Sequence, residues 1–204
     1  MIPSGRLRWW YVAVLLVVVL GCAGSSSRDA ASLVQEPQAA SLSAQPLSPE
    51  GKASLHDLIQ SGSFSELYWP NFSAYREDVA KFYESYNYAL PWVRGMRPSP
   101  QAQAVITALE QADDKGLSAE DYDGPRWAAR LAKLRPFTSD PAEADALRFD
   151  LALTISLMRY ISDLHTGKID PHRFDIEANI AARKYNLPEF LKDEIVPAAD
   201  IPAK

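Results

Sequence analysis

The fold depends most on one segment, "PAEADALRFDLALTISLMRYISDLHTG", which runs from Pro141 to Gly167. Asp140 and Pro141 at its start and Gly167 at its end are typical helix boundary residues, and Glu143 fits the first turn. Its apolar residues recur at helical spacing in two adjoining rows. The rows are Leu147, Leu151, Ile155, Met158 and Ile161, and Phe149, Leu153, Leu157, Tyr160 and Leu164. A helix that is apolar on two sides is normally central in a bundle, so we predict a central helix here.

Two polar residues interrupt the apolar surface of this predicted helix. Asp150 and Thr154 lie one helical turn apart. If both are buried, their side chains can satisfy each other by hydrogen bonding.

Helix punctuation recurs through the rest of the chain, whereas no strand alternation of any length is found. A capping pattern also occurs at Ser118–Asp121 and predicts a short turn there. The other predicted helices run from Pro49 towards Gln60 with Gly62 as the stop, over Phe72–Tyr86, from Pro100 to a stop at Gly116, over Pro125–Leu134, and over Pro188–Ile195. We therefore predict an all-α fold, with a single helical domain over residues 49–204.

Composition restricts the function classes. The 204 residues carry a formal charge of −5, with 47% hydrophobic and 23% charged residues, which is the balance of a folded soluble domain. No basic face that would bind nucleic acid is indicated. The single cysteine, Cys22, lies at the end of an N-terminal apolar run, so we expect no disulfide, cysteine-based zinc site or cysteine nucleophile in the mature domain.

Residues 1–22 have the order of a bacterial signal peptide. Arg6 and Arg8 precede the apolar run Trp9–Leu20, which is shorter than the ~20 residues of a spanning helix. Its end, "VLGC", resembles a lipobox, which implies lipidation at Cys22; an ordinary cleaved signal and an uncleaved anchor are the alternatives. All three place the domain in an envelope compartment, on the periplasmic side. Residues 23–48 are rich in Ser, Ala, Gln and Pro and predict a disordered tether.

The stretch "DLHTGKIDPHRF" is the first candidate for chemistry. It carries His165 and His172, with Asp163, Asp170 and Asp175 close by. Imidazole and carboxylate groups suit zinc or iron. The two histidines are seven residues apart across a Gly and a Pro, however, and not on one helix face. We favour helix termination at Gly167 over a metal site, and we predict no metal or cofactor.

Catalytic patterns are weak elsewhere. The sequence has no G-x-S-x-G elbow, and the acidic pairs in "EQADDKG" and "SAEDYDG" fit solvated turns. No catalytic residue is therefore predicted. The aromatic stretch "FYESYNYALPWV" is the best candidate for a ligand or partner surface, because Tyr and Trp combine an apolar ring with a polar edge. Its candidates are Tyr83, Tyr86, Tyr88 and Trp92, and a role in the core is the alternative.

Two blocks of the chain carry a family resemblance. They are "YWPNFSAYREDVAKFYESYNYALPWVRGMRPSPQAQAVITALEQADDKGLSAEDYD" and "LRFDLALTISLMRYISDLHTGKIDPHRF". In order, they give a Phe-Tyr pair leading to a Trp, a helix opened by Pro-Gln-Ala, "A-D-x-K-G-L-S-x-E-D-Y", and a long helix followed by "L-x-x-G-x-I-x-P". This series, over roughly residues 64–195, resembles the N-terminal scaffold domain of the large bacterial L,D-transpeptidases.

The resemblance implies an envelope protein concerned with peptidoglycan cross-linking. Enzymes of that family join stem peptides through a 3→3 bond with the cysteine of a Ser-His-Gly-Cys motif in a separate domain. The present sequence ends at Lys204 without that motif. We therefore expect a scaffold module without transpeptidase activity of its own, either a truncated or split family member or a standalone binding module. The expected partners are peptidoglycan or a cell-wall enzyme or catalytic domain, and the membrane through the N-terminal anchor.

Two functions from other classes remain as alternatives. One is a peptidoglycan hydrolase that uses two carboxylates about 5–9.5 Å apart across a cleft. The other is a metal-binding envelope protein.

Overall fold

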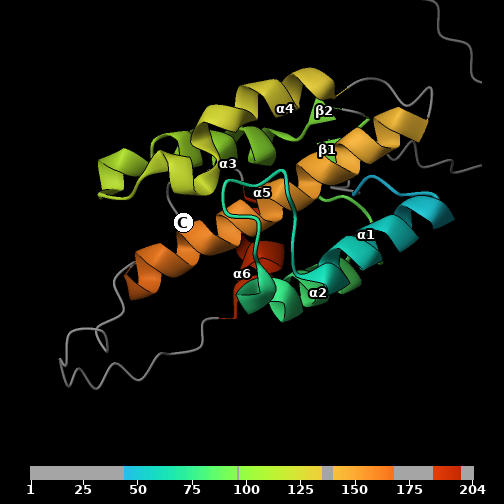
Figure 1. Ribbon diagram of the computed structural model, residues 1–204, viewed down its shortest axis with the longest axis horizontal. Coiled ribbons are helices and arrows are strands. Elements are labelled where there is room, and N and C mark those ends of the chain that lie inside the picture. The colour runs from blue at the N-terminus through green and yellow to red at the C-terminus, as the bar shows by residue number, and fades with distance from the viewer. Residues whose placement is uncertain (1–43, 96, 135–139, 168–185, 199–204) are drawn as a thin grey trace, which may run out of the picture. The chain divides into compact units, whose positions relative to one another are not determined.

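The computed structural model of the chain describes residues 44–95, 97–134, 140–167 and 186–198 (Figure 1). The predicted signal segment with Cys22, and the predicted tether up to Ser43, lie outside the described residues. The α-helices are α1 Pro49–Ser61, α2 Arg76–Ser85, α3 Pro100–Glu110, α4 Trp127–Lys133, α5 Asp140–Thr166 and α6 Leu187–Phe190. The shorter elements are 3₁₀ turns at Ser73–Tyr75, Ala112–Lys115, Ala119–Tyr122 and Gly124–Arg126, a π-helical turn at Leu191–Ile195, and strands β1 Val93–Arg94 and β2 Arg97–Pro98.

α5 is the central helix, as its two apolar rows predict. It packs against α1, α3 and α4, and α2 packs against α1 and α6. Figure 1 shows α5 running between the α3 and α4 pair and the α1 and α2 pair. Residues of both rows are buried along its middle, including Leu151 and Leu153 with no exposed surface. The all-α prediction is confirmed.

The predicted starts of α1 and α3 are confirmed by their caps. The Oγ atom of Ser48 accepts a hydrogen bond from the N–H of Gly51 at 3.0 Å, and Oγ of Ser99 accepts one from Ala102 at 3.0 Å. Each serine is followed by a proline at the first helical position, where the missing N–H costs nothing. Gly62 ends α1 with a φ of 63°, in the left-handed region that favours glycine.

Glu143 has a different role from the one its position in the first turn of α5 suggests. Its carboxylate accepts hydrogen bonds from the backbone N–H of Ser48 at 2.7 Å and from the Ser48 hydroxyl at 2.6 Å. A residue of α5 therefore completes the cap of α1 across a separation of 95 positions in the sequence.

Several predicted boundaries differ from the structure. α2 begins at Arg76, after a 3₁₀ turn, and not at Phe72. α3 ends at Glu110, while Gly116, with a φ of 74°, ends the 3₁₀ turn that follows. Ser118 precedes a turn as predicted, but its side chain forms no capping hydrogen bond. In this four-residue 3₁₀ turn, the Ser118 carbonyl accepts from the N–H of Asp121 at 3.1 Å instead.

Among the described residues, β-strand pairing is limited to very short segments. β1 and β2 form a two-residue antiparallel pair, which is too short for sequence alternation to reveal. Gln45 pairs with Leu90 through two backbone hydrogen bonds of 2.9 and 2.8 Å, so ordered contacts begin before residue 49. None of the described helices combines the length and apolar character needed to cross a membrane.

Candidate functional site

The chain between α1 and α2, residues 62–72, forms a closed loop. The N–H of Phe72 donates to the carbonyl of Gly62 at 2.8 Å, and the N–H of Phe64 donates to the carbonyl of Pro70 at 2.8 Å. Phe64, Leu67 and Phe72 are buried beneath it. Because three apolar side chains anchor the loop and its ends pair with each other, its tip has a defined position.

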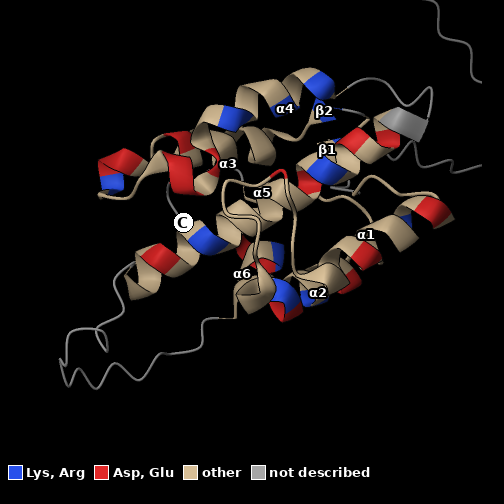
Figure 2. Cartoon of the chain, in the orientation of Figure 1, with Lys and Arg blue, Asp and Glu red and all other residues tan. Residues whose placement is uncertain are grey.

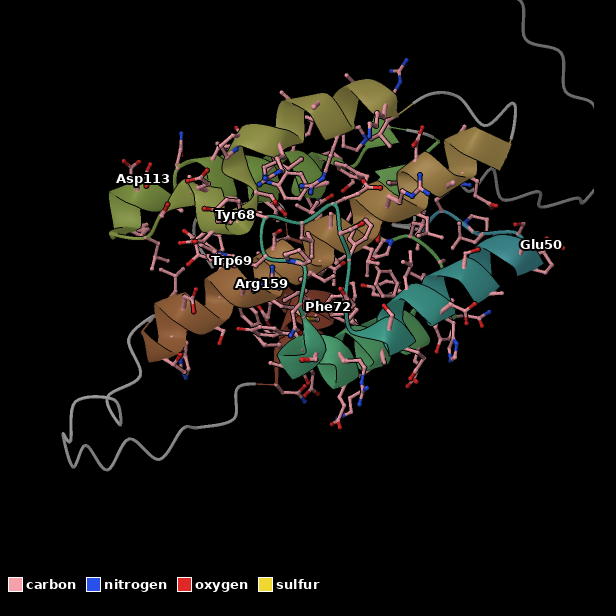
Figure 3. The ribbon with its side chains drawn as sticks, viewed as in Figure 1. Glu50, Tyr68, Trp69, Phe72, Asp113 and Arg159 are labelled. Atoms are coloured by element: carbon pink, nitrogen blue, oxygen red, sulfur yellow. The ribbon has the colours of Figure 1, made fainter. Side chains whose placement is uncertain are left out.

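Three buried charged side chains hold the same loop through its backbone. Asp123 accepts from the N–H of Tyr68 at 2.7 Å, and Arg130 donates to the carbonyl of Glu66 at 2.7 Å. Arg159 on α5 donates to the carbonyls of Trp69 at 2.8 Å and Asn71 at 2.7 Å. Figure 3 shows the Arg159 side chain reaching from α5 towards this loop. Hydrogen bonds with a charged partner are stronger than neutral ones, so these contacts fix the loop on the helices.

Asp123 is the centre of the charged cluster. It is 1% exposed, and its carboxylate lies 3.3 Å from Arg126 and 3.3 Å from Arg130, with Ser156 donating to it at 3.2 Å. Burial lowers the pKa values of Arg130 and Arg159, and the charge of Asp123 opposes this shift in both. A buried carboxylate that faces two guanidinium groups is compensated, whereas removing one partner would leave an unpaired charge.

The loop presents an aromatic surface, which we call the Trp69 surface and define as Tyr68, Trp69, Asp121 and Arg126. Trp69 is 53% exposed, the most exposed large apolar side chain of the described residues. Its indole N–H donates to the carboxylate of Asp121 at 2.8 Å, and the Tyr68 ring lies edge-on at 5.0 Å. The guanidinium of Arg126 lies 5.1 Å from the centre of the Tyr68 ring. An open indole face beside a carboxylate and a guanidinium can stack on an apolar ligand face and bind polar groups at its edge.

Sequence reasoning did not single out the Trp69 surface. The signal is "YWPN", an aromatic pair followed by a proline in a connection between two helices. Large aromatic residues in such a connection are either anchors or contact residues, and the sequence alone does not separate these roles.

The four aromatic residues proposed from the sequence do not form one surface. Tyr83 and Trp92 have no exposed area and belong to the core, so they cannot line a surface in this fold. Tyr86 and Tyr88 are partly exposed. Burial, and to a smaller extent Asp193 and Asp150, raises the pKa of Tyr86 to about 12. A binding role for Tyr86 and Tyr88 remains a prediction.

Asp150 and Thr154 are both buried, but they do not satisfy each other in the predicted way. The Thr154 hydroxyl donates to the backbone carbonyl of Asp150 at 3.0 Å, and the two side chains meet through the hydroxyl of Tyr83. The partner from α2 could not be found from the sequence, because it lies 67 positions from Asp150.

The stretch around His165 behaves as the end of α5. Gly167 follows the helix with a φ of 83°, which agrees with helix termination. Asp163 accepts from the hydroxyl of Tyr122 at 2.7 Å, which helps to raise the pKa of that tyrosine beyond the effect of burial. No group of metal-binding side chains is found among the described residues. His172, Asp170 and Asp175 lie outside them.

The acidic turns differ from the prediction in one respect. Figure 2 shows acidic positions in the turns that follow α3. Asp113 accepts from the N–H of Ala119 at 3.3 Å, as expected for a turn residue. Asp123 was predicted to be solvated and is instead buried in the charged cluster, because two arginines compensate it.

Comparison with known families identifies the family of the chain. A family model described as "Scaffold domain" matches residues 77–202, and the chain belongs to this family. The match is consistent with the scaffold domain of the L,D-transpeptidases, which the two sequence blocks resemble. No curated protein and no solved structure matches the chain.

Proposed function

We propose that this chain is an envelope-anchored scaffold module that binds peptidoglycan and holds it for cross-linking by a cell-wall enzyme. The Trp69 surface is its proposed contact site. The match to the Scaffold domain over residues 77–202 is the observation that supports this proposal most strongly. The lipobox-like end at Cys22 supports attachment to a membrane on the periplasmic side.

The rigid presentation of Trp69 supports a binding role. A side chain that is 53% exposed adds little to the stability of the fold, yet three buried charged residues hold the backbone on which it sits. An immobilised aromatic ring loses little entropy on binding. Its flat face suits the apolar face of a sugar ring, and the carboxylate of Asp121 can accept hydrogen bonds from hydroxyl or ammonium groups.

The role proposed for this chain is binding, and we assign no catalytic residue to it. The alternative of a hydrolase requires two carboxylates across a cleft, and Glu50 and Glu143 line a hollow beside α1. Glu143, however, already accepts two hydrogen bonds from Ser48. Its engagement as a cap favours a structural role for this carboxylate over general acid catalysis.

Co-sedimentation of the full-length chain with purified sacculi tests the proposal. We expect the wild-type chain to sediment with the sacculi, and Trp69→Ala to bind about tenfold more weakly, which corresponds to about 1.4 kcal/mol. Tyr88→Ala, which removes a partly exposed aromatic ring from the surface proposed from the sequence, is the matched control and should bind within about twofold of wild type. If Tyr88→Ala weakened binding to the sacculi and Trp69→Ala did not, the binding site would lie on the surface that contains Tyr88.

A wild-type chain that does not bind sacculi would contradict the proposed function. Incubation of the same chain with tetrapeptide muropeptides is the second arm. Formation of 3→3 dimers would show that the chain is catalytic and would refute a purely binding role.

A further inference from the structure

Four buried polar side chains connect α2, the segment before β1, and α5. Tyr83, Trp92, Asp150 and Thr154 have no exposed surface. The Asp150 carboxyl group meets the Tyr83 hydroxyl at 2.7 Å through Oδ1 and the backbone N–H of Trp92 at 2.8 Å through Oδ2. The Thr154 hydroxyl oxygen accepts from the Trp92 indole N–H at 2.9 Å, lies 3.0 Å from the Tyr83 hydroxyl, and lies 3.0 Å from the Asp150 carbonyl.

The number of hydrogen atoms available to this network bears on the protonation state of Asp150. Three of its contacts join two oxygen atoms: Asp150 Oδ1 with Tyr83, Tyr83 with Thr154, and Thr154 with the Asp150 carbonyl. Each contact needs one hydrogen, but the two hydroxyl groups supply only two. With an ionised Asp150, one contact between buried oxygens has no hydrogen.

A proton on Oδ1 of Asp150 completes the set. Asp150 then donates to the Tyr83 oxygen, Tyr83 donates to Thr154, and Thr154 donates to the Asp150 carbonyl. Thr154 accepts two hydrogen bonds, from Tyr83 and from the Trp92 indole, which matches its two lone pairs. Every polar atom of the four side chains is then paired, and no buried charge remains.

We propose that Asp150 is a neutral carboxylic acid in the folded chain, and that its network is a pH-sensitive lock between α2 and α5 which loosens when the proton is lost. This inference goes beyond the proposed function and does not depend on peptidoglycan binding. It would make the folded scaffold responsive to alkaline conditions.

The electrostatic environment agrees with the hydrogen count. Burial raises the pKa of Asp150 to about 8, and the hydrogen bonds that Tyr83 and the Trp92 N–H would donate to an ionised Asp150 only partly oppose this shift. Within the described part of the chain, the ionisable groups that interact with Asp150 are Tyr83 on α2 and Tyr86 at the end of that helix, and Asp193 from the π-helical turn acts on Tyr86. Among the residues that the structure describes, no lysine, arginine or histidine contributes to the shift in the pKa of Asp150.

The direction of the pH dependence follows from proton linkage. The folded chain binds this proton with a pKa of about 8, and the unfolded chain with the ordinary value of 3.8. The stabilisation is complete below the unfolded value and is lost as the pH rises towards the folded value. Between these limits the folding equilibrium constant should fall about tenfold per pH unit because of Asp150, which is about 1.4 kcal/mol per unit.

Asp150→Asn separates this inference from a purely structural role. The Asn amide can donate to Tyr83 and its oxygen can accept from the Trp92 N–H, so it reproduces the protonated acid without titrating. Equilibrium unfolding of the full-length chain is measured between pH 5 and 9. The ratio of the wild-type folding constant to that of Asp150→Asn should fall by about tenfold per pH unit up to pH 8, and should then stay constant.

Asp123→Asn is the matched control, because Asp123 is also buried but faces two arginines. It should destabilise the chain, because it leaves Arg126 and Arg130 without their anionic partner, whereas Asp150→Asn keeps the contacts of the protonated acid. A ratio of wild-type to Asp150→Asn folding constants that does not change with pH would overturn the proposal.

A direct readout on the wild-type chain covers the case in which the variant does not fold. The infrared spectrum of the folded full-length chain at pH 6, with aspartate labelled by ¹³C, should show the C=O band of a protonated carboxylic acid. The band should disappear when the pH is raised through about 8. Absence of a protonated aspartate at pH 6 would overturn the proposal independently of any variant.

Discussion

Arg159→Met tests whether buried charges hold the Trp69 surface in place. Arg159 is 8% exposed, and its guanidinium donates to the carbonyls of Trp69 and Asn71 at 2.8 and 2.7 Å. Met keeps most of the apolar stem and removes both donors. Each hydrogen bond from a charged group contributes about 1.5–3 kcal/mol, and removing the charge recovers part of its own desolvation cost. We expect a net loss of about 2–4 kcal/mol in the free energy of unfolding.

The same substitution at Arg148 is the control. Arg148 also lies on α5, but its side chain is 50% exposed and its ion pair with Glu66 spans 3.4 Å. An exposed ion pair contributes about 0–1 kcal/mol, so Arg148→Met should change the stability by less than about 1 kcal/mol. Urea unfolding of the full-length chain gives both values.

Amide hydrogen exchange locates the effect of Arg159→Met. The N–H groups of Phe64 and Phe72, which pair within the loop, should lose protection against exchange. The amides in the middle of α5 should lose no more protection than the measured decrease in global stability explains. The reasoning would be refuted if Arg159→Met unfolded within about 0.5 kcal/mol of wild type and left these two amides protected.

Three further substitutions test the ends of the helices and the core. Ser99→Ala removes the cap of α3 and should cost about 1 kcal/mol in urea unfolding; an unchanged midpoint would show that the cap is dispensable. Gly62→Ala places a Cβ 3.3 Å from the Cα of Ser73 at a positive φ, and should lower the melting temperature more than Gly116→Ala, whose Cβ meets nothing within 4 Å. Equal shifts would remove the packing argument. Leu151→Ala should cost about 2–5 kcal/mol by calorimetry, because Leu151 has no exposed surface; a loss below 1 kcal/mol would contradict the central position of α5.

Local chemistry made the helices predictable. Ser48 and Ser99 with their following prolines, and Gly62 and Gly167 at helix ends, act through neighbouring backbone groups, so their effect can be seen in a short window of sequence. The two apolar rows of α5 predicted its central position for the same reason.

Long-range pairing was not predictable in this way. Asp150 was recognised as a polar residue in an apolar helix, but its partner Tyr83 lies 67 positions away and was assigned to a surface. Asp123 had the sequence context of a solvated turn, yet the guanidinium groups of Arg126 and Arg130 make its burial possible. These long-range contacts hold the backbone of the loop that carries Trp69, so the candidate site could be recognised only in the folded chain.

Titration of the full-length chain with disaccharide tetrapeptide muropeptides, followed by NMR of the tryptophan indole N–H groups, tests the central claim most directly. The indole of Trp69 is exposed beside Asp121, whereas those of Trp92 and Trp127 are buried and donate to Thr154 and to the carbonyl of Tyr122. We predict a saturable shift of the Trp69 signal with the two buried signals unchanged. Signals that all remain unchanged at high ligand concentration would contradict the assignment of peptidoglycan binding to the Trp69 surface.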